Sequence, residues 1–414
     1  MSTDTLVAAT PSAQSRRTLA ACCGAHVLHD GFSDMLYVLF PVWQAAFGLS
    51  FAQVGLLKTM YSGSMAALQL PASILAERVG ERVLLALGTL IAAAAFIVSG
   101  WTGGFLGLAL CLMVGGAGAS VQHPLASALT SRAFEGAQSR AALGTYNFFG
   151  DIGKVLLPAL CAALLAVFDW HAVTPLMGAL GLIAALAIWF GVPRELPQAV
   201  SAANAPPAPA AAGTATNAAP GTERSALSAL ANQGFISLAA VGVIDSATRM
   251  GFLTLLPFVL IAKGASVTQV GFALSLTFAG GAAGKFVCGL IAARVGVLRT
   301  TILTEIATAA GIVALLPLSL ESSMLLLPAV GIALNGTSSV LYGTVAELVP
   351  GEQRARAFGV FYTLTIGAGA LSPLLYGLLG DAIGVPRTFG VIAALVLLVL
   401  PLTLGLRPAL RAAD

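Results

Sequence analysis

The chain has 414 residues, of which 58% are apolar and 9% are charged. Soluble proteins carry about a quarter charged residues, so this composition excludes an ordinary soluble protein and indicates a membrane protein. The net charge is +3, and the Lys and Arg residues lie in short segments between apolar runs, without the basic tract typical of nucleic-acid binding. We therefore expect the lipid bilayer as a partner and no nucleic acid.

Apolar runs long enough to cross a hydrocarbon core of roughly 30 Å recur along the chain. They predict an all-α membrane protein with twelve transmembrane helices in two pseudo-symmetric six-helix bundles. The expected spans are 20–46, 51–76, 83–101, 105–130, 141–167, 172–192, 229–261, 267–293, 300–320, 324–349, 357–380 and 388–406.

Two helical halves joined by a linker are the expected domains. Their order is a tail (1–19), a first half (20–192), a flexible linker (193–228), a second half (229–406) and a second tail (407–414). Residues 197–222 are rich in Ala and Pro and poor in large apolar side chains, which favours disorder. Most Arg residues outside the spans fall on one side of the membrane, so the positive-inside rule predicts that the two termini and the linker are cytoplasmic. We expect a plasma membrane protein, which in a bacterium would lie in the inner membrane. We expect it to function as a monomer.

The two halves repeat each other in sequence. A shift of 216 positions pairs Ser50 with Ser266, Gln53 with Gln269, Gly55 with Gly271 and Gly80 with Gly296, without a gap. Repeated six-helix halves are typical of secondary transporters, whose binding site lies near the midplane between the halves.

The stretch SILAERVGER (Ser73 to Arg82) resembles the loop between helices two and three of the major facilitator superfamily, and GLIAARVGVLR (Gly289 to Arg299) resembles its second copy. This resemblance implies the superfamily fold and a gating loop. The gating residues that it implies are Glu77, Arg78, Gly80, Arg82 and Arg294.

Three further stretches are similar to the fosmidomycin-resistance branch of drug exporters within that superfamily. They are AHVLHDGFSDMLYVLFPVW in the first helix, GAGASVQHP in the fourth and YNFFGDIGKVLLP in the fifth. The resemblance implies efflux and drug resistance.

Ionisable residues within the spans point to proton coupling. An ionised side chain at the bilayer centre costs about 2.5 to 3.5 kcal/mol, so each one needs a partner, a water-filled cavity or a function. His26, Asp30 and Asp34 recur at helical spacing on one face of the first helix. Asp30 and Asp34 are the expected proton carriers, with His26 and His29 as candidate relays and Asp151 as the next candidate.

Other polar residues within the spans are candidates for substrate binding. They are Tyr37, Lys58, Gln122, His123, Asn147, Lys154, Asp245, Arg249, Lys285, Asn335 and Tyr342. Lys154, Arg249 and Lys285 place cationic groups at membrane depth, so we expect an anionic or acidic substrate. Lys285 has no acidic residue one helical turn away, so its replacement is the test of this expectation.

Alternative interpretations of these residues stay open. Asp151 with Lys154, and Asp245 with Arg249, can be structural ion pairs that hold helices in place. Lys58 can reach toward the outer membrane interface. Glu305 stands near the expected cytoplasmic face, where water would solvate it.

These patterns predict a secondary active transporter that moves a small organic molecule, anionic or drug-like, by alternating access. We expect a proton-coupled antiporter that exports its substrate, with a proton-linked importer of a small organic anion as the alternative. An enzyme is disfavoured because His26 and His29 lack further metal ligands at suitable spacing. A sensor would carry an added soluble domain. No ATP-binding loop is present, and we expect no metal or cofactor.

Overall fold

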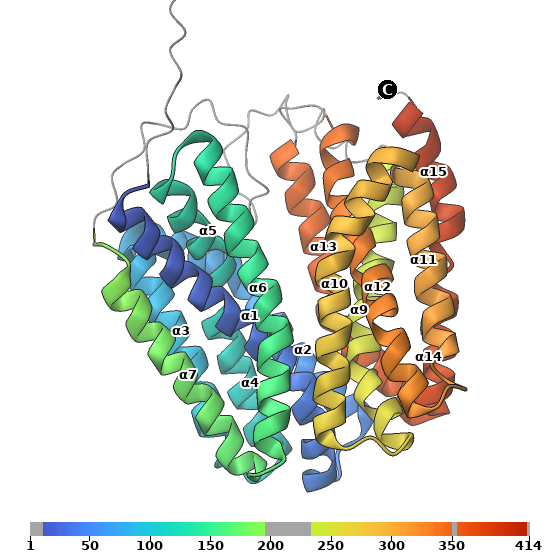
Figure 1. Ribbon diagram of the computed structural model, residues 1–414, viewed down its shortest axis with the longest axis horizontal. Coiled ribbons are helices and arrows are strands. Elements are labelled where there is room, and N and C mark those ends of the chain that lie inside the picture. The colour runs from blue at the N-terminus through green and yellow to red at the C-terminus, as the bar shows by residue number, and fades with distance from the viewer. Residues whose placement is uncertain (1–10, 195–232, 350–353, 412–414) are drawn as a thin grey trace, which may run out of the picture.

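The computed structural model describes residues 11–194, 233–349 and 354–411, which form helices and no strand. The first half comprises α1 (Ala13–Phe47), α2 (Phe51–Val79), α3 (Glu81–Ser99), α4 (Phe105–Ala119), α5 (Gln122–Ala133), α6 (Gly136–Leu165) and α7 (Trp170–Gly191). The second half comprises α9 (Gln233–Ala262), α10 (Val267–Val295), α11 (Val297–Ala314), α12 (Leu320–Leu348), α13 (Arg354–Ile383), α14 (Val385–Val396) and α15 (Val399–Arg411). The two halves form separate bundles side by side (Figure 1).

The expected membrane-spanning architecture is confirmed. Ten segments of the described chain are long and apolar enough to cross a bilayer. The helices α1 and α2 are at least as long as most of these segments but are not among the ten, and their expected spans carry Asp30 and Asp34 in α1 and Lys58 in α2. The stretch 197–222, expected to be flexible, lies outside the described residues.

Two of the expected spans are each broken into a pair of helices. The span 105–130 is divided between α4 and α5, and the span 388–406 between α14 and α15. The first break lies at Ser120 and Val121, just before Pro124. Proline has no backbone N–H to bond the carbonyl four residues earlier, so a continuous helix loses a hydrogen bond here. The break places Gln122 and His123 at the start of α5.

The sequence repeat corresponds to repeated local structure. Ser50 and Gln53 form a capping box at the start of α2, and Ser266 and Gln269 form the same box at the start of α10. In each box two backbone N–H groups that the helix leaves unpaired gain a side-chain partner. The turn after each of these helices is a glycine with positive φ, 91° at Gly80 and 87° at Gly296. The matched residues are therefore the ones that begin and end the matched helices.

The halves meet along two related pairs of helices, α2 with α13 and α6 with α10. Gly55 of α2 lies against the backbone of Pro373, and its repeat partner Gly271 of α10 lies against Pro158 and Ala162. A side chain at Gly55 would collide with the carbonyl oxygen of Pro373, so glycine allows the two helices to approach closely.

One end of the molecule holds the halves together more closely than the other. We call the end at which α1 begins and α15 ends the terminal side, and the opposite end the far side. The bundles diverge toward the terminal side (Figure 1). On the far side, the Asp381 carboxylate of α13 accepts hydrogen bonds from the backbone N–H groups of Phe51 (2.8 Å) and Ala52 (2.9 Å) at the start of α2. The space between the halves is therefore closed off at the far side.

Candidate functional site

A cavity of about 230 Å³ lies between the two halves and is lined by both. Charged and polar side chains dominate one part of its wall, and apolar side chains cover the rest. The lining residues are His29, Asp30, Ser33, Asp34, Met65, Ala119, Gln122, His123, Lys154, Arg249, Met250, Leu253, Phe278 and Asn335. Eight residues predicted as site candidates from the sequence are among them.

Close packing of α1 against α6 brings the charged residues together. Gly153 of α6 lies against the backbone of Val27, and Gly150 lies under the ring of His26. A side chain at Gly150 would collide with that ring. The approach lets the Tyr146 ring stack on His26 with ring centroids 4.1 Å apart. The YNFFGDIGK stretch thus supplies both the small residues that permit the contact and the side chains that use it.

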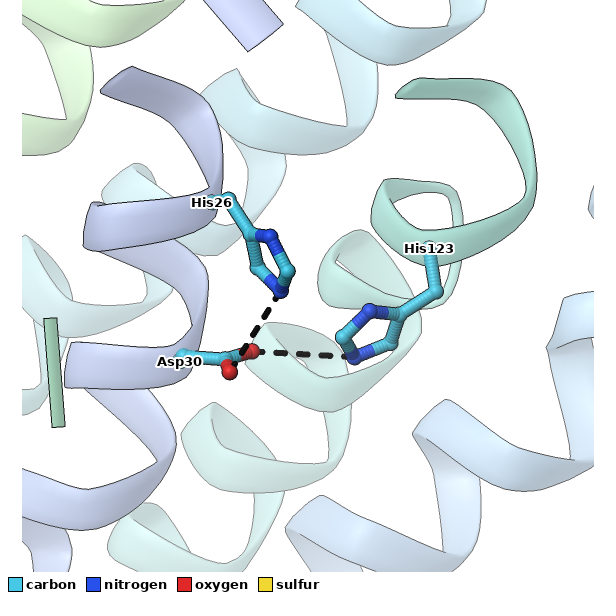
Figure 2. Close-up of side chains that lie close together, drawn as sticks. All are labelled: His26, Asp30 and His123. Atoms are coloured by element: carbon cyan, nitrogen blue, oxygen red, sulfur yellow. Dashed lines mark ion pairs between the residues drawn. The ribbon is translucent and has the colours of Figure 1, made fainter. Parts of the chain in front are cut away.

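Asp30 is the centre of the charged part of the cavity. One of its oxygens lies 3.4 Å from Nε2 of His26 and 3.3 Å from Nζ of Lys154, and the other lies 3.7 Å from Nε2 of His123. Figure 2 shows the Asp30 carboxylate facing both imidazole rings, with a dashed line to each. The carboxylate is 8% exposed, so little water competes for it. Three different helices, α1, α5 and α6, contribute to this cluster.

The hydrogen bonds of His26 define which of its nitrogens faces Asp30. Nδ1 of His26 lies 2.8 Å from the carbonyl oxygen of Tyr146, which can only accept, so Nδ1 carries a hydrogen. Nε2 therefore faces the Asp30 carboxyl as an acceptor unless it is also protonated. A hydrogen bond between the His26 ring and the Asp30 carboxyl therefore requires a hydrogen on Nε2 or on the carboxyl.

The same atoms form the one three-residue group in the described chain that could hold a metal ion. Ligand atoms of His26, Asp30 and His123 all lie within 4.8 Å of one another. Sequence spacing did not indicate this group, because the fold brings His123 from α5 to His26, whereas His29 is not part of it. The Lys154 ammonium already lies beside the Asp30 carboxylate, and its positive charge opposes a second cation there.

Lys58 lies inside the bundle. Its side chain is fully buried, and its ammonium donates to the carbonyl oxygen (2.9 Å) and the hydroxyl (3.0 Å) of Ser33. The ammonium also lies 4.5 Å from the centre of the Tyr37 ring. The alternative in which Lys58 reaches the outer interface is therefore wrong. Tyr37 in turn donates its hydroxyl hydrogen to Sδ of Met250 in the other half, at 3.5 Å.

The other two residues expected on the proton path differ in their surroundings. His29 Nε2 lies 3.0 Å from the hydroxyl of Thr89, which donates its own hydrogen to a carbonyl, so His29 ties α1 to α3. Asp34 lines the cavity, and no cationic side chain in the described chain lies within ion-pair distance of it.

Asp151 contacts two lysines, and one of them, Lys285, belongs to the other half. Its carboxylate accepts from Lys285 of α10 at 2.6 and 2.7 Å and lies 3.4 Å from Lys154 of its own helix. Although Lys285 has no acidic residue one turn away on its own helix, it does have an acidic partner, which comes from the other half. The expected contact between Asp151 and Lys154 is confirmed.

Arg249 is a cation of the cavity with no carboxylate within ion-pair distance among the described residues. Its guanidinium donates to the hydroxyl of Ser338 at 3.2 Å, and Ser338 donates to the Asp245 carboxylate at 2.8 Å. The expected ion pair between Asp245 and Arg249 is thus replaced by a link through Ser338. Tyr342 lines a small pocket of about 10 Å³ beside this link.

Two residues lie elsewhere than the sequence suggested. Asn147 is exposed and does not line the cavity. Glu305 of α11 is 1% exposed, so the expectation that water solvates it is wrong. The apolar residues around Glu305 in the sequence are the feature that could have indicated its burial.

The loop residues implied by the family resemblance lie at the terminal side. Glu77, Arg78 and Arg294 are exposed. Arg82 donates to the backbone carbonyl of Trp189 and lies over its ring, 4.8 Å from the centre. The neighbouring Glu81 pairs with Arg132. The Glu81–Arg132 ion pair and the hydrogen bond from Arg82 each join helices of the first half and do not cross to the second half. This agrees with the divergence of the two halves at the terminal side.

Two repeated helical bundles with a charged cavity between them are the architecture of a secondary transporter. The family model of the Major Facilitator Superfamily matches residues 22–259 and 238–413, and the chain belongs to this superfamily.

Relatives agree with this assignment. The fosmidomycin resistance protein of Escherichia coli (strain K12) is 22% identical over 92% of this chain and 90% of its own length. A probable L-galactonate transporter of the same organism is 26% identical over 36% of this chain and 32% of its own length.

Solved structures agree as well. A bacterial homologue of the human lysosomal transporter Spinster, described as inward-facing and occupied, has a TM-score of 0.78 at 17% identity, covering 98% of this chain and 99% of its own. The nucleoside transporter NupG, solved as a point mutant, has a TM-score of 0.77 at 13% identity, covering 94% of this chain and 99% of its own.

Proposed function

We propose that the chain is a proton-coupled transporter of a small organic anion, and that it exports its substrate. The observation that carries this proposal is the position of Asp30, held between two histidines and Lys154 on the wall of the cavity. The relation to a fosmidomycin resistance protein supports export of a drug-like compound.

The proposed substrate is an anion because the cavity offers cationic donors. Arg249 has no carboxylate partner within ion-pair distance among the described residues, and a guanidinium binds carboxylate and phosphate groups through two parallel hydrogen bonds. Lys154 reaches the same cavity. An anion between these two side chains would contact both halves, since they belong to α6 and α9.

We further propose that the terminal side faces the cytoplasm, following the distribution of Arg residues outside the spans. The described conformation, closed at the far side by Asp381, would then be open toward the cytoplasm. Alternating access requires that these far-side contacts break while the terminal-side ends of the halves come together.

A second candidate is a proton-linked importer, and one observation favours it. Lys154 lies close to both Asp30 and Asp151, so protonation of Asp30 would leave the ammonium less engaged and available for an anion. Proton and anion would then bind together and move in the same direction.

Transport by the purified chain in liposomes, with an imposed pH gradient, tests both candidates. Fosmidomycin is the first compound to assay, followed by a panel of small carboxylates and phosphonates. Export by exchange predicts that substrate accumulates in the more acidic compartment. Linked import predicts accumulation in the more alkaline compartment. Net uptake of substrate that is insensitive to the gradient would contradict proton coupling in either direction.

A further inference from the structure

A pair of buried carboxyl groups lies in the second half, away from Asp30. Asp245 of α9 is 5% exposed and Glu305 of α11 is 1% exposed. Their side chains are in hydrogen-bond contact with each other. Neither has a cationic side chain within ion-pair distance in the described part of the chain.

A hydroxyl group lies beside each member of the pair, Ser338 beside Asp245 and Thr337 beside Glu305. Ser338 donates its hydroxyl hydrogen to Asp245 at 2.8 Å. The oxygen Oε1 of Glu305 is buried and has no hydrogen-bond partner. The Thr337 hydroxyl, which lies near Glu305, bonds to Thr304 at 2.6 Å.

Two ionised carboxylates in direct contact, out of water, repel each other strongly, so such a pair holds a proton between its members. Asp245 already receives a hydrogen bond from Ser338 and is suited to be the ionised member. Glu305, buried more deeply and with an oxygen lacking a partner, is suited to be the protonated member that donates to Asp245.

We propose that Asp245 and Glu305 form a second proton-binding site of this transporter, located in the second half and linked to the cavity through Ser338 and Arg249. Arg249 lines the cavity and also donates to Ser338, so a single guanidinium faces both the substrate space and the carboxyl pair. Binding of an anion by Arg249 and proton occupancy of the pair are therefore coupled.

Few charged or titratable groups face the pair. Arg249 from α9 and Tyr342 from α12 are the ones that interact electrostatically with it among the described residues. Coupling to substrate rests on the proposed function, whereas the presence of the shared proton does not.

Infrared spectroscopy of the purified chain in liposomes, without substrate, tests for the proton directly. The carbonyl stretch of a protonated carboxyl is separate from that of a carboxylate. At neutral pH we expect the difference spectrum between the natural chain and Glu305→Gln to contain this band, shifted in D₂O. Glu321→Gln, at an exposed position in the first turn of α12, is the matched control and should show no such band.

Asp245→Asn provides a second measurement of the same proton. The asparagine amide can donate to Glu305, so the shared proton is no longer required and the band should again be lost. Gel filtration of each variant reports whether it is folded. A Glu305→Gln or Asp245→Asn spectrum that matches the natural chain in the protonated-carboxyl region would overturn the proposal.

The link to the cavity has its own readout. A saturating concentration of an anion that is transported should change the intensity of the Glu305 band, and Arg249→Gln should remove this response while the band itself persists. A band that never responds to the anion would overturn the coupling but leave the proton site standing. Failure of all transport with an intact band would contradict the proposed function alone.

Discussion

The properties of Asp30 follow from neighbours on three helices. An isolated carboxylate among apolar helices would be expensive to bury, and here Lys154, His26 and His123 compensate its charge. In the function proposed above, the same histidines would also exchange a proton with Asp30. Burial of Asp30 and the proposed proton exchange would then depend on one set of side chains.

Replacing Asp30 with Asn should separate coupling from binding. Asn keeps the size of the side chain but cannot take up a proton, so we expect gradient-driven accumulation in liposomes to fall to background while counterflow at equal concentrations persists. Asp169→Asn is the matched control, because Asp169 caps α7 outside the cavity. Accumulation by Asp30→Asn at the natural rate would show that Asp30 does not carry the coupled proton.

Arg249→Lys should weaken anion binding although the charge is kept. Lysine offers a point charge where arginine offers two parallel donors, and a charge-assisted hydrogen bond contributes about 1.5 to 3 kcal/mol. We expect the apparent affinity for an anion, measured by counterflow, to fall by roughly ten- to a hundredfold. Lys285→Arg is the comparison, since Lys285 is already paired with Asp151. Equal affinity in both variants would place the anion elsewhere.

At the scale of helices, the start of α2 is a contact between the halves. The first N–H groups of a helix have no partner within it and carry partial positive charge, which suits a carboxylate. Asp381, from the end of α13, supplies that carboxylate. In the repeat, the start of α10 has the same capping box, but Asp381 has no acidic counterpart in the first half: the shift of 215 that pairs Pro158 with Pro373 places Ala166 at that position. The far-side contact is therefore asymmetric.

Asp381→Asn should loosen the far side. An amide oxygen accepts less strongly than a carboxylate, so we expect a larger population with the halves separated there. Spin labels at Val167 and Glu321, both exposed near far-side helix ends, would report a longer distance distribution. The same labels with Asp169→Asn serve as the control. An unchanged distribution in Asp381→Asn would show that the contact does not hold the far side closed.

At the scale of the whole molecule, the two halves share their packing residues but differ in their charges. Packing residues such as Gly55 and Gly271 match under the repeat, whereas Asp34 aligns with Met250 and Lys285 with Gln69. The matched residues build the same helix contacts twice, and the unmatched Asp34 and Met250 both line the cavity. The Asp151–Lys285 pair is the ion pair that crosses between halves in the described chain.

Reversing the charge of Lys285 should disturb the approach of the halves. Lys285→Glu would place a second carboxylate beside Asp151, and the two would repel each other, whereas Lys285→Gln only removes an attraction. We therefore expect substrate exchange to slow more in the Glu variant. Adding Asp151→Asn to Lys285→Glu should restore exchange to the level of Lys285→Gln. Partial exposure of Lys285 keeps the expected effect to about 1 kcal/mol or less for the Gln variant. Equal rates of substrate exchange in Lys285→Glu, Lys285→Gln and the double variant would show that the Asp151–Lys285 pair does not affect transport.

The sequence by itself determined the helices and their duplication. Runs of apolar residues, capping residues such as Ser50 and Ser266, and turn glycines such as Gly80 act within a few residues, so their effects can be read without a fold. The intramembrane charges were equally visible, because any ionised group in a bilayer is costly. The break at Ser120 was the exception, since Pro124 can be accommodated within a helix or can divide it.

Only the tertiary structure decided which charges meet. Spacing along one helix suggested that Asp245 pairs with Arg249, but both residues bond to Ser338 instead. The same spacing suggested that Lys285 stands alone, but Lys285 bonds to Asp151. Each of these contacts crosses from one helix to another, over separations of 89 to 134 residues. Such contacts depend on how helices rotate and approach, which small residues such as Gly150 set by removing side-chain volume. Local pattern therefore identifies the charged residues and a contact within one helix, Asp151 with Lys154, whereas packing assigns the partners that come from other helices.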